Sequence, residues 1–443
     1  MNKKNGMMLF SCFLMGISLY AQKVVNLREA IDYSLKNHRS AVIYNNKIGI
    51  VANQKKDAVS GYLPQVNGSF GFDNNIKRQT TVFPGIMLGS PTDVEVQFGN
   101  KYTGLATLQL DQTIYDQALI YGIKAGIPTK LIAELNRDKN NEDLIYNTAT
   151  SFFQILVLKE QQKLLVVNEK QYEELYRISK LRFDKGVGKK VDVDKVIVRL
   201  NDIKADLKQI ELDINVAYNA LRDAMALPLS DTFVVEENLN YGKYMEVQND
   251  TLNIKELIGY KLQEQNIILQ EIDLKRKRAA YLPTVDAFAR AGEQAFGNDL
   301  DKVFNRWKDF STVGLKVNIP IFSGGHRDSQ IQISRLELDN AKQDFGQDVA
   351  DFETKFENAR RQLPEDVAKL NSNKTNMELA KSIYETNKFE YDKGTALMSD
   401  LMDTDFTYRQ AESKYMSSLF NLVTNRLIYE RAKGTIRSFV NQL

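Results

Sequence analysis

The residue types that most often perform catalysis or bind metals are few in this chain, and they do not cluster. The chain has 443 residues and contains one cysteine, Cys12, and two histidines, His38 and His326. The histidines have no metal-ligand spacing to each other. The sequence contains neither a glycine-rich phosphate loop nor a nucleophile elbow. It therefore predicts a protein that is not an enzyme and that has no cofactor or resident metal ion.

Two methionines near the C-terminus have a spacing that permits metal chemistry. Met398 and Met402 are four residues apart, so they share one face of a predicted helix. Thioether sulfur is a soft ligand, and such a pair would suit a route for copper or silver ions. Methionines at helical spacing are more often part of a packed core. Packing is therefore the preferred interpretation.

The net charge argues against a nucleic-acid partner. The 59 basic and 57 acidic residues nearly cancel. Outside the N-terminus, no apolar run reaches the roughly 18 residues that a membrane-spanning helix needs.

The N-terminus has the pattern of a secretory signal peptide, which we predict over residues 1–21. Lys3 and Lys4 precede an apolar stretch, and Ala21 completes a suitable cleavage site. A retained membrane anchor and a lipoprotein signal at Cys12 are weaker alternatives, because the apolar run is short and few residues precede the cysteine. Cleavage after Ala21 would leave an exported chain without thiols.

A short motif that occurs twice indicates how the chain is organised. Tyr62-Leu63-Pro64 recurs as Tyr281-Leu282-Pro283, 219 residues later. Each copy follows a stretch with helical spacing of apolar residues and precedes a stretch of alternating apolar and polar residues. Proline disfavours helical geometry in the residue before it and cannot donate within a helix, so it enforces the change. The chain is therefore predicted to be a tandem duplication.

Two strands are predicted in each half of the chain. In the first half they flank a loop over residues 74–101 that contains several glycines and prolines. In the second half they flank a shorter loop over residues 292–309. The strands are short and have apolar residues on one face, which is typical of transmembrane barrel strands.

Each half then continues into two long helices joined by a turn. The turns share the residues Asp-Lys-Gly, at 184–186 and 392–394. Pro128 and Pro364 are expected to interrupt the helices before these turns. The helix after the first turn carries apolar residues at alternating steps of three and four, which is the signature of a coiled coil.

These elements divide the mature chain into two structural repeats. The first is assigned to residues 22–228 and the second to residues 253–434. Residues 229–252, rich in Asn, Asp and Glu, are interpreted as a segment between the repeats, and residues 435–443 as a C-terminal tail.

Four strands of this kind cannot form a membrane channel on their own. An open sheet edge is not tolerated in lipid, and four strands enclose no channel. Other copies of the chain must complete the barrel, and the long helices must pack on one another because little other chain remains to cover them. The alternative, a half-buried sheet of a soluble protein, agrees less well with the export signal and the long helices.

With these features the chain resembles the TolC-like outer-membrane efflux proteins of Gram-negative bacteria, over essentially its whole mature length. The resemblance rests on Leu-Arg-Glu-Ala-Ile at 27–31, on the two Tyr-Leu-Pro motifs, on Pro-Ile-Phe-Ser-Gly-Gly at 320–325 and on the acidic stretch 400–403. No single motif is specific, but their order and duplication are.

The resemblance implies a fold that is mainly α with a small β part. Three subunits, each giving four strands, would form a twelve-stranded barrel, and their long coiled-coil helices would form a tunnel through the periplasm. Residues near 229–252, the surroundings of Pro364 and the C-terminal tail would form a belt around the tunnel. The implied partners of this homotrimer are outer-membrane lipid, a periplasmic adaptor and an inner-membrane pump. Its role would be passive export of small molecules, metal ions or proteins, as in type I secretion.

The resemblance also assigns an acidic ring. Asp400 and Asp403 match a pair that surrounds the tunnel entrance in the family, so three subunits would place six carboxylates around one axis. The alternative is that both are acids favoured by the N-terminal dipole of a helix.

The network that closes the entrance in the family has two further counterparts here. Asp192, after the first turn, and Tyr391, before the second, match its positions. Ala396 departs from the pattern, because the best-known members have an arginine at that place. Closure would then rest on other contacts. Lys189 and Lys190, close to Asp192 in the sequence, are candidates to substitute for the arginine, although solvated surface lysines are the preferred interpretation.

The same resemblance predicts where the two Tyr-Leu-Pro motifs lie relative to the membrane. Tyr62 and Pro64, with Tyr281 and Pro283, would lie at the boundary between periplasmic helix and lipid-embedded strand. The loop over residues 74–101 would then face the outside of the cell.

A periplasmic coiled-coil adaptor, or a structural protein without a pore, is the main alternative function. It would explain the heptads but not the four alternating strands.

Overall fold

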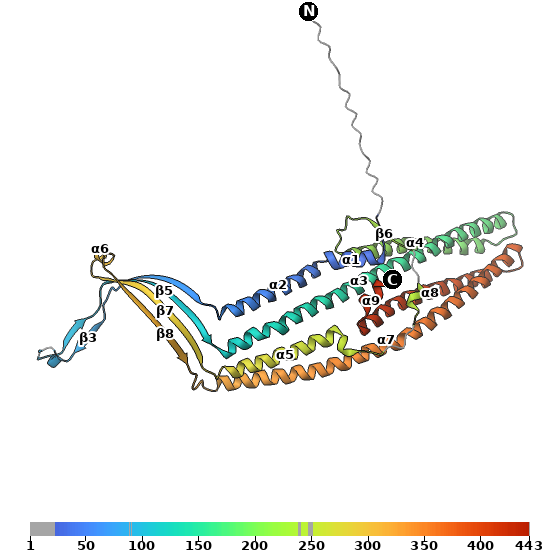
Figure 1. The fold of residues 1–443 in the computed structure, drawn as a ribbon. Coiled ribbons are helices and arrows are strands. Elements are labelled where there is room, and N and C mark those ends of the chain that lie inside the picture. The colour runs from blue at the N-terminus through green and yellow to red at the C-terminus, as the bar shows by residue number, and fades with distance from the viewer. Residues whose placement is uncertain (1–22, 88, 90, 238–240, 247–250, 443) are drawn as a thin grey trace, which may run out of the picture. The chain divides into compact units, whose positions relative to one another are not determined.

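The computed structural model describes most of the chain (Figure 1). The described residues are 23–87, 89, 91–237, 241–246 and 251–442. The predicted signal peptide, residues 1–21, lies outside them.

The main elements occur in the same order in both halves of the chain: a helix, two strands of one sheet, a long helix, a turn and another long helix. In the first half these are α2 (Arg39–Ser60), β2 (Gln65–Asn74), β5 (Tyr102–Tyr115), α3 (Gln117–Asp184) and α4 (Lys190–Met225). In the second half they are α5 (Ile258–Ala279), β7 (Thr284–Gly297), β8 (Trp307–Asn318), α7 (His326–Lys393) and α8 (Met398–Lys433). The predicted class, mainly α with a small β part, is confirmed.

Shorter elements complete the part of the chain that the structure describes. They are β1 (Lys23–Val25), α1 (Leu27–Asn37), β3 (Thr80–Phe83), β4 (Val94–Gln97), β6 (Phe233–Val235), α6 (Leu300–Val303), α9 (Ile436–Asn441) and single 3-10 turns at Gly85–Met87, Tyr241–Tyr244 and Ile254–Glu256. Within this part, no helix holds a stretch long and apolar enough to cross a membrane.

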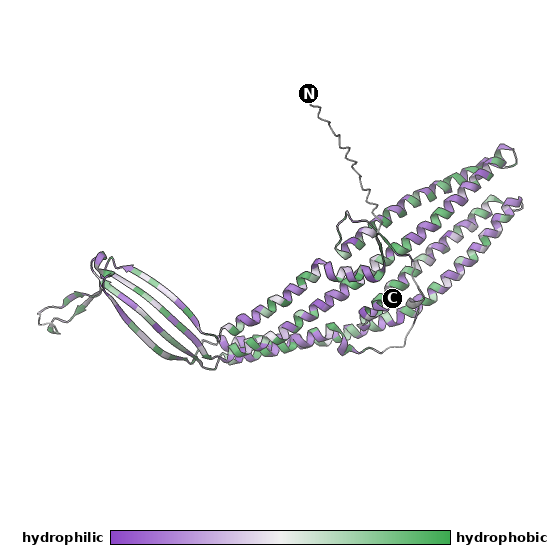
Figure 2. Ribbon diagram, turned by 45° about the horizontal axis from the view of Figure 1, so that its top comes forward, coloured by the Kyte–Doolittle hydropathy of each residue, from purple (hydrophilic) through white to green (hydrophobic). Residues whose placement is uncertain are grey.

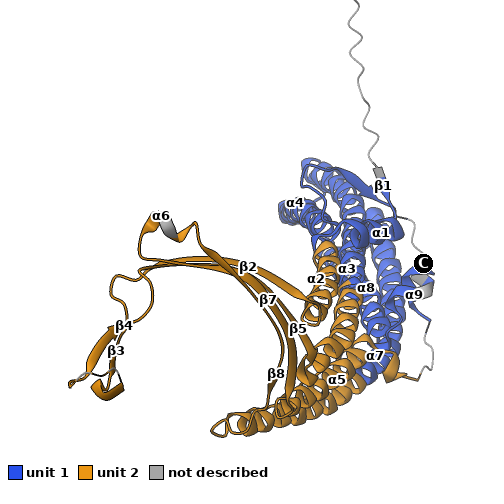
Figure 3. Cartoon of the chain, turned by 60° about the vertical axis from the view of Figure 1, so that its left-hand side comes forward, with its two compact units in different colours: residues 1–39, 141–250, 356–443 blue, residues 40–140, 251–355 orange. Residues whose placement is uncertain are grey.

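The chain forms two compact units, and each unit takes segments from both halves of the sequence (Figure 3). Unit 1 comprises residues 1–39, 141–250 and 356–443, and unit 2 comprises residues 40–140 and 251–355. The long helices α3 and α7 contribute to both units.

Both predicted proline interruptions are wrong. Pro128 lies inside α3 and Pro364 lies inside α7, and each helix continues over 68 residues. A proline inside a helix removes one backbone hydrogen bond and costs about 3 kcal/mol. The many remaining bonds and the packing of such a long helix outweigh that local cost.

Two predicted loops contain more regular structure than expected. Within residues 74–101, β3 and β4 pair as an antiparallel hairpin, whose flanking rings of Phe83 and Phe98 are 5.6 Å apart. Within residues 292–309, β7 continues to Gly297 and β8 begins at Trp307. These strand ends form because β7 has a hydrogen-bonded partner on each side, β5 and β8.

The helical pattern before the first Tyr-Leu-Pro motif is divided in two. His38 has an extended backbone, with φ −64° and ψ 136°, and separates α1 from α2. Its backbone N–H still donates to the carbonyl oxygen of Ser34, so the last turn of α1 is closed.

Unit 2 contains a four-stranded sheet in the order β2-β5-β7-β8, in which neighbouring strands are antiparallel. The register places apolar residues side by side across the sheet: Val66 pairs with Leu110, Leu110 with Ala289, and Ala289 with Val313. The next positions lie on the opposite face and are polar, as with Asn67 beside Gln109. Hydrophobic and hydrophilic residues accordingly alternate along the strands (Figure 2).

The apolar face of this sheet is exposed in the single chain. Val313 is 83% exposed, Phe70 65% and Val66 59%. Moreover, in the part of the chain that the structure describes, β2 and β8 are edge strands of the sheet, each with a neighbour on one side only. The sheet therefore has an uncovered apolar face and two unpaired edges.

One core of unit 1 brings together the N-terminal segment, the segment between the repeats and the C-terminal tail. β1 and β6 pair in parallel. The Tyr244 ring lies 5.2 Å from that of Phe153 and 5.6 Å from that of Phe439. The Ser34 hydroxyl donates to the carbonyl oxygen of Ala224 at 2.6 Å. These contacts fix short elements that have little packing surface of their own.

The predicted heptad stripe of α4 faces the protein interior. Its buried members are Val193, Val196, Ile203, Ile210, Ile214, Ala217 and Leu221. This packing explains why α4 extends over 36 residues without a break, since an amphipathic stripe stabilises a helix mainly through tertiary contacts.

A small ion-pair network connects α3 to the segment after β6. Lys159 and Lys163 both contact the Glu237 carboxylate, at 3.0 and 2.7 Å. The hydrogen bonds from Lys163 and Lys159 lower the pKa of Glu237. Because its folded pKa is depressed, Glu237 stabilises the fold above its unfolded pKa, and this contribution is lost as the pH falls through the folded value.

We therefore expect Glu237→Gln to lower the midpoint of thermal unfolding at pH 7, through a loss of less than about 1 kcal/mol for this half-exposed network. The difference from wild type should shrink below the folded pKa of Glu237, where the wild-type carboxyl is itself protonated. Thermal unfolding of the purified proteins, followed by circular dichroism at a series of pH values, measures both the loss at pH 7 and its dependence on pH. Glu236→Gln, an exposed neighbour, is the control, and an equal difference at all pH values would contradict the assignment.

Candidate functional site

The two Asp-Lys-Gly turns of unit 1 are built in the same way. Gly186 and Gly394 have φ of +74° and +81°, a conformation that glycine adopts at little cost. The N–H of the residue after each glycine donates to a carbonyl five residues back, Val187 to Arg182 and Thr395 to Glu390, at 3.0 Å. Each glycine thus ends one long helix and lets the next begin.

The acidic pair lies at the start of α8. Asp400 and Asp403 are both exposed, one helical turn apart on the same face. The Asp400 carboxylate accepts a hydrogen bond from the Ser399 hydroxyl at 3.1 Å. Within the described residues, neither carboxylate forms an ion pair. Asp400 lies in the first turn of the helix and Asp403 beyond it, so the helix dipole accounts for only one of the two acids.

The structure brings Asp192 and Tyr391 to one cavity of unit 1. It has a volume of about 350 Å³ and is also lined by Arg182, Lys189 and Ala396. Asp192 lies in the first turn of α4, and Tyr391 is 5% exposed near the end of α7. Burial raises the pKa of Tyr391, so its phenol stays neutral.

Arg182 is the residue at this cavity that sequence reasoning missed. Its Nη2 donates to the carbonyl oxygens of Tyr391 and Asp392, both at 2.9 Å. Its guanidinium also lies 4.6 Å from the centre of the Tyr391 ring. Arg182 therefore links the first turn to the second. The only signal in the sequence is a basic residue in the last turn of α3, a common position for one.

Lys189 and Lys190, the lysines considered as replacements for the missing arginine, are exposed. Among the described residues, neither forms an ion pair with Asp192. The positive charge that contacts the second turn comes from Arg182 instead.

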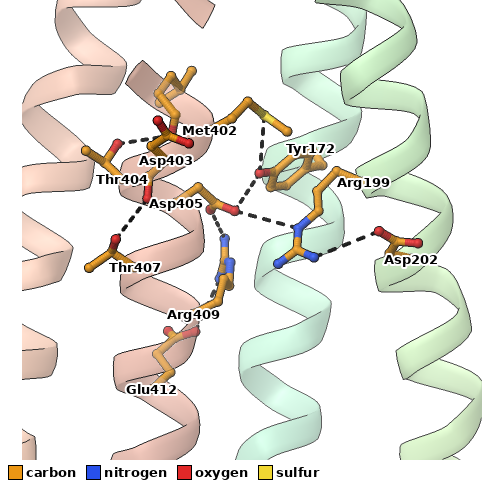
Figure 4. Close-up of polar contacts among 11 residues, drawn as sticks. Tyr172, Arg199, Asp202, Met402, Asp403, Thr404, Asp405, Thr407, Arg409 and Glu412 are labelled. Atoms are coloured by element: carbon orange, nitrogen blue, oxygen red, sulfur yellow. Dashed lines mark hydrogen bonds and ion pairs between the residues drawn. The ribbon is translucent and has the colours of Figure 1, made fainter. Parts of the chain in front are cut away.

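A buried ionic cluster lies along α8, further from its start than the acidic pair (Figure 4). Asp405 is 1% exposed. Its carboxylate accepts a hydrogen bond from the Tyr172 hydroxyl at 2.5 Å and one from Arg409 at 3.0 Å, and Arg199 lies 3.9 Å away. Arg409 also donates to Glu412 at 3.3 Å. The cluster joins α8 to α3 and α4.

Three tyrosines around this cluster are held neutral. Burial, together with the Asp405 carboxylate, raises the pKa of Tyr172 and raises that of Tyr384 to about 12. Burial and the nearby Glu412 raise the pKa of Tyr408. Tyr172 therefore remains a hydrogen-bond donor to Asp405 at any physiological pH.

Both methionines of the possible soft-metal route are part of the packing. Met398 is 3% exposed, and Met402 packs against the same core with its sulfur 3.9 Å from the Tyr172 hydroxyl. In the described residues there is no group of three or more His, Cys, Asp or Glu side chains able to hold a metal ion.

The tyrosines of the two Tyr-Leu-Pro motifs each contact the start of a long helix in unit 2. The Tyr62 hydroxyl donates to the carbonyl oxygen of Asp116, just before α3, at 2.8 Å. The Tyr281 hydroxyl donates to the Asp328 carboxylate, in the first turn of α7, at 2.8 Å. Pro64 and Pro283 directly precede β2 and β7. Each motif thus fixes the geometry where helices meet strands.

Comparison with known proteins identifies the family. A model of the outer membrane efflux protein family matches residues 53–227 and 265–426. The proteases secretion protein PrtF of Dickeya chrysanthemi is 25% identical over 254 residues, which cover 53% of this chain and 54% of PrtF. The outer membrane efflux protein BepC of Brucella suis is 24% identical over 333 residues, which cover 71% of this chain and 65% of BepC. The matches thus span between half and two thirds of these two relatives.

The fold has a close counterpart among solved structures. The outer membrane protein VceC of Vibrio cholerae superimposes with a TM-score of 0.76 at 13% identity, over 92% of this chain and 96% of VceC. At that identity the likeness concerns the fold alone. The family model, however, matches most of the sequence, and the chain belongs to the outer membrane efflux protein family.

Proposed function

We propose that the protein is a passive channel through the outer membrane of a Gram-negative bacterium. Three copies would assemble, each giving β2, β5, β7 and β8 to a twelve-stranded barrel, and their long helices would form a periplasmic tunnel. The tunnel would dock to a periplasmic adaptor and an inner-membrane pump, which would supply the energy and select the cargo. Family membership supports this proposal.

The observation that carries the proposal is the sheet of unit 2. Its apolar face is exposed, with Leu315 at 71% and Val313 at 83%, and among the described residues its edge strands have no second neighbour in the sheet. In lipid every backbone polar group needs a partner, so such a sheet must close into a barrel with other copies. The apolar face would contact lipid, and the polar face would line the channel. A soluble adaptor or a structural protein without a pore does not explain this face.

The names of the relatives support a channel for exported cargo, of which both proteins and smaller molecules are candidates. PrtF is a proteases secretion protein, and BepC is an outer membrane efflux protein. We propose the two repeats, residues 22–228 and 253–434, as the halves of the subunit, with residues 229–252 and 435–443 in a belt around the tunnel. Tyr62, Pro64, Tyr281 and Pro283 would then mark the periplasmic boundary of the membrane.

We further propose that the turns between the long helices form the tunnel entrance. Asp400 and Asp403, exposed and unpaired within the described residues, would supply six carboxylates in a trimer. Asp192, Tyr391 and Arg182 would hold the two turns of one subunit together. In the best-known members of the family, an arginine stands at the place of Ala396. Arg182 would perform the role of that arginine here.

In planar bilayers the purified protein should form cation-selective channels that divalent cations block. Asp400→Ala with Asp403→Ala should reduce both the selectivity and the block, because the carboxylates that attract cations are removed. Glu211→Ala with Asp223→Ala removes two other exposed carboxylates, on α4, and serves as the control. Channels with unchanged selectivity would refute the acidic ring, and a failure to form channels would refute the function.

Arg182→Ala should loosen the second turn, because two charge-assisted hydrogen bonds to its carbonyls are lost. Hydrogen exchange of amides in residues 391–397 should become about tenfold faster or more, as a loss of 1.5–3 kcal/mol implies. Arg177→Ala is the control, because it removes an exposed arginine of α3 whose one ion pair within the described residues is with Glu174, three positions earlier. If both variants exchanged at the same rate, Arg182 would not hold the turn.

A further inference from the structure

The polar face of the sheet in unit 2 carries an arginine between two aromatic rings. The register places Arg290 of β7 in one row across the sheet with Gln109 of β5 and Thr312 of β8. The member of this row on β2 is Asn67, so Arg290 is its one charged residue. Arg290 is exposed, and among the described residues it forms no ion pair and no side-chain hydrogen bond.

The two rings lie on the same face, one row before and one row after Arg290. The ring of Phe288 reaches from β7 towards β8, where a Cβ at Gly314 would lie 2.7 Å from its Cζ. The ring of Phe310 reaches in the opposite direction, where a Cβ at Gly292 would lie 3.1 Å from its Cζ. The glycines thus leave room for both rings. Rows on one face are about 7 Å apart, so a flat molecule on either ring is within reach of the arginine side chain.

The carboxylates near Arg290 on this face have other neighbours. Asp111 lies one row away, and both its oxygens accept from Nε2 of Gln109 at 2.9 Å. Asp286 lies two rows away and stands opposite Lys316 in the register. The guanidinium of Arg290 therefore has no counter-charge beside it in its own row and is available to an anion.

In the proposed trimer this face would line the channel, and the inference rests on that proposed function. Three copies would place three guanidinium groups at one level of the barrel wall, each between two phenyl rings. A water-filled lumen needs a polar wall and does not require such rings. A guanidinium group binds an oxyanion through two parallel hydrogen bonds, and a phenyl ring offers a flat apolar surface for stacking.

We infer that this part of the channel wall binds organic anions with a flat apolar body, one in each subunit. Arg290 pairs with the anionic group, and Phe288 or Phe310 contacts the apolar body. The barrel thus favours a different class of molecule from the acidic residues proposed for the entrance, which attract cations.

Naphthalenesulfonate, methanesulfonate and naphthalenemethanol are matched probes for this site, because only the first has both the charge and the rings. In planar bilayers containing the purified full-length protein, naphthalenesulfonate should block the current reversibly. The other two probes should need concentrations about tenfold higher or more, since each lacks one of the two contacts.

Variants locate the block on the sheet. Arg290→Gln should weaken it about tenfold or more, because the charge-assisted hydrogen bonds are lost. Lys316→Gln removes a cation of the same face that stands opposite Asp286, so it should leave the block nearly unchanged. Phe310→Leu should weaken the block severalfold, and it decides the question if Arg290→Gln forms no channels.

The outcomes separate this site from the proposed function. Channels that naphthalenesulfonate does not block, or that all three probes block equally, would overturn the site and leave the channel intact. A block that Arg290→Gln and Lys316→Gln weaken equally, or that Phe310→Leu does not weaken, would also overturn it. A protein that forms no channels at all would refute the proposed function, and the site with it.

Discussion

The rest of the structure depends on one constraint: a single chain can neither pair the edge strands of its sheet nor cover the apolar face of that sheet. Four strands in the order β2-β5-β7-β8 leave two edges with unpaired backbone groups and an exposed apolar face. In water the backbone groups of the edges can bond to solvent, but the apolar face is unfavourably exposed. In lipid the apolar face is well solvated, but the backbone groups of the edges have no hydrogen-bond partners. Closure with further copies of the chain satisfies both requirements. Each half of the chain contributes a pair of strands to this sheet and a pair of long helices, in the same order.

Helices as long as α3 and α7 need contacts along their length and a defined end. The stripe on α4 and the buried Asp405 cluster supply contacts between the long helices of unit 1. Gly186 and Gly394 supply the ends. Arg182 then connects one end to the other through backbone carbonyls, an interaction that does not depend on the side chain present at position 396. The proposed entrance thus rests on a few polar contacts, whereas the core of unit 1 around Tyr244 rests on apolar packing.

The sequence predicted the features that depend on local rules. The change from helix to strand at Pro64 and Pro283, the turns at Gly186 and Gly394 and the stripe of α4 follow from backbone chemistry and periodicity. Features that depend on distant partners were not predictable. Continuity of α3 through Pro128 results from tertiary packing that outweighs a local penalty. Arg182 was missed because its partners are carbonyl groups some 210 residues away, which no residue pattern reveals.

Disulfide cross-linking between the two sheet edges tests the central claim most directly. In a single chain β2 and β8 are three strand spacings apart, about 14 Å, which exceeds the reach of a disulfide. Ser69→Cys in β2 can be combined with Thr312→Cys or Lys316→Cys in β8, in a chain whose one native cysteine lies in the predicted signal peptide. Oxidation in the membrane should yield covalent species of two and three chains and none larger. A ladder beyond three chains, or no cross-link along β8, would contradict closure by three copies.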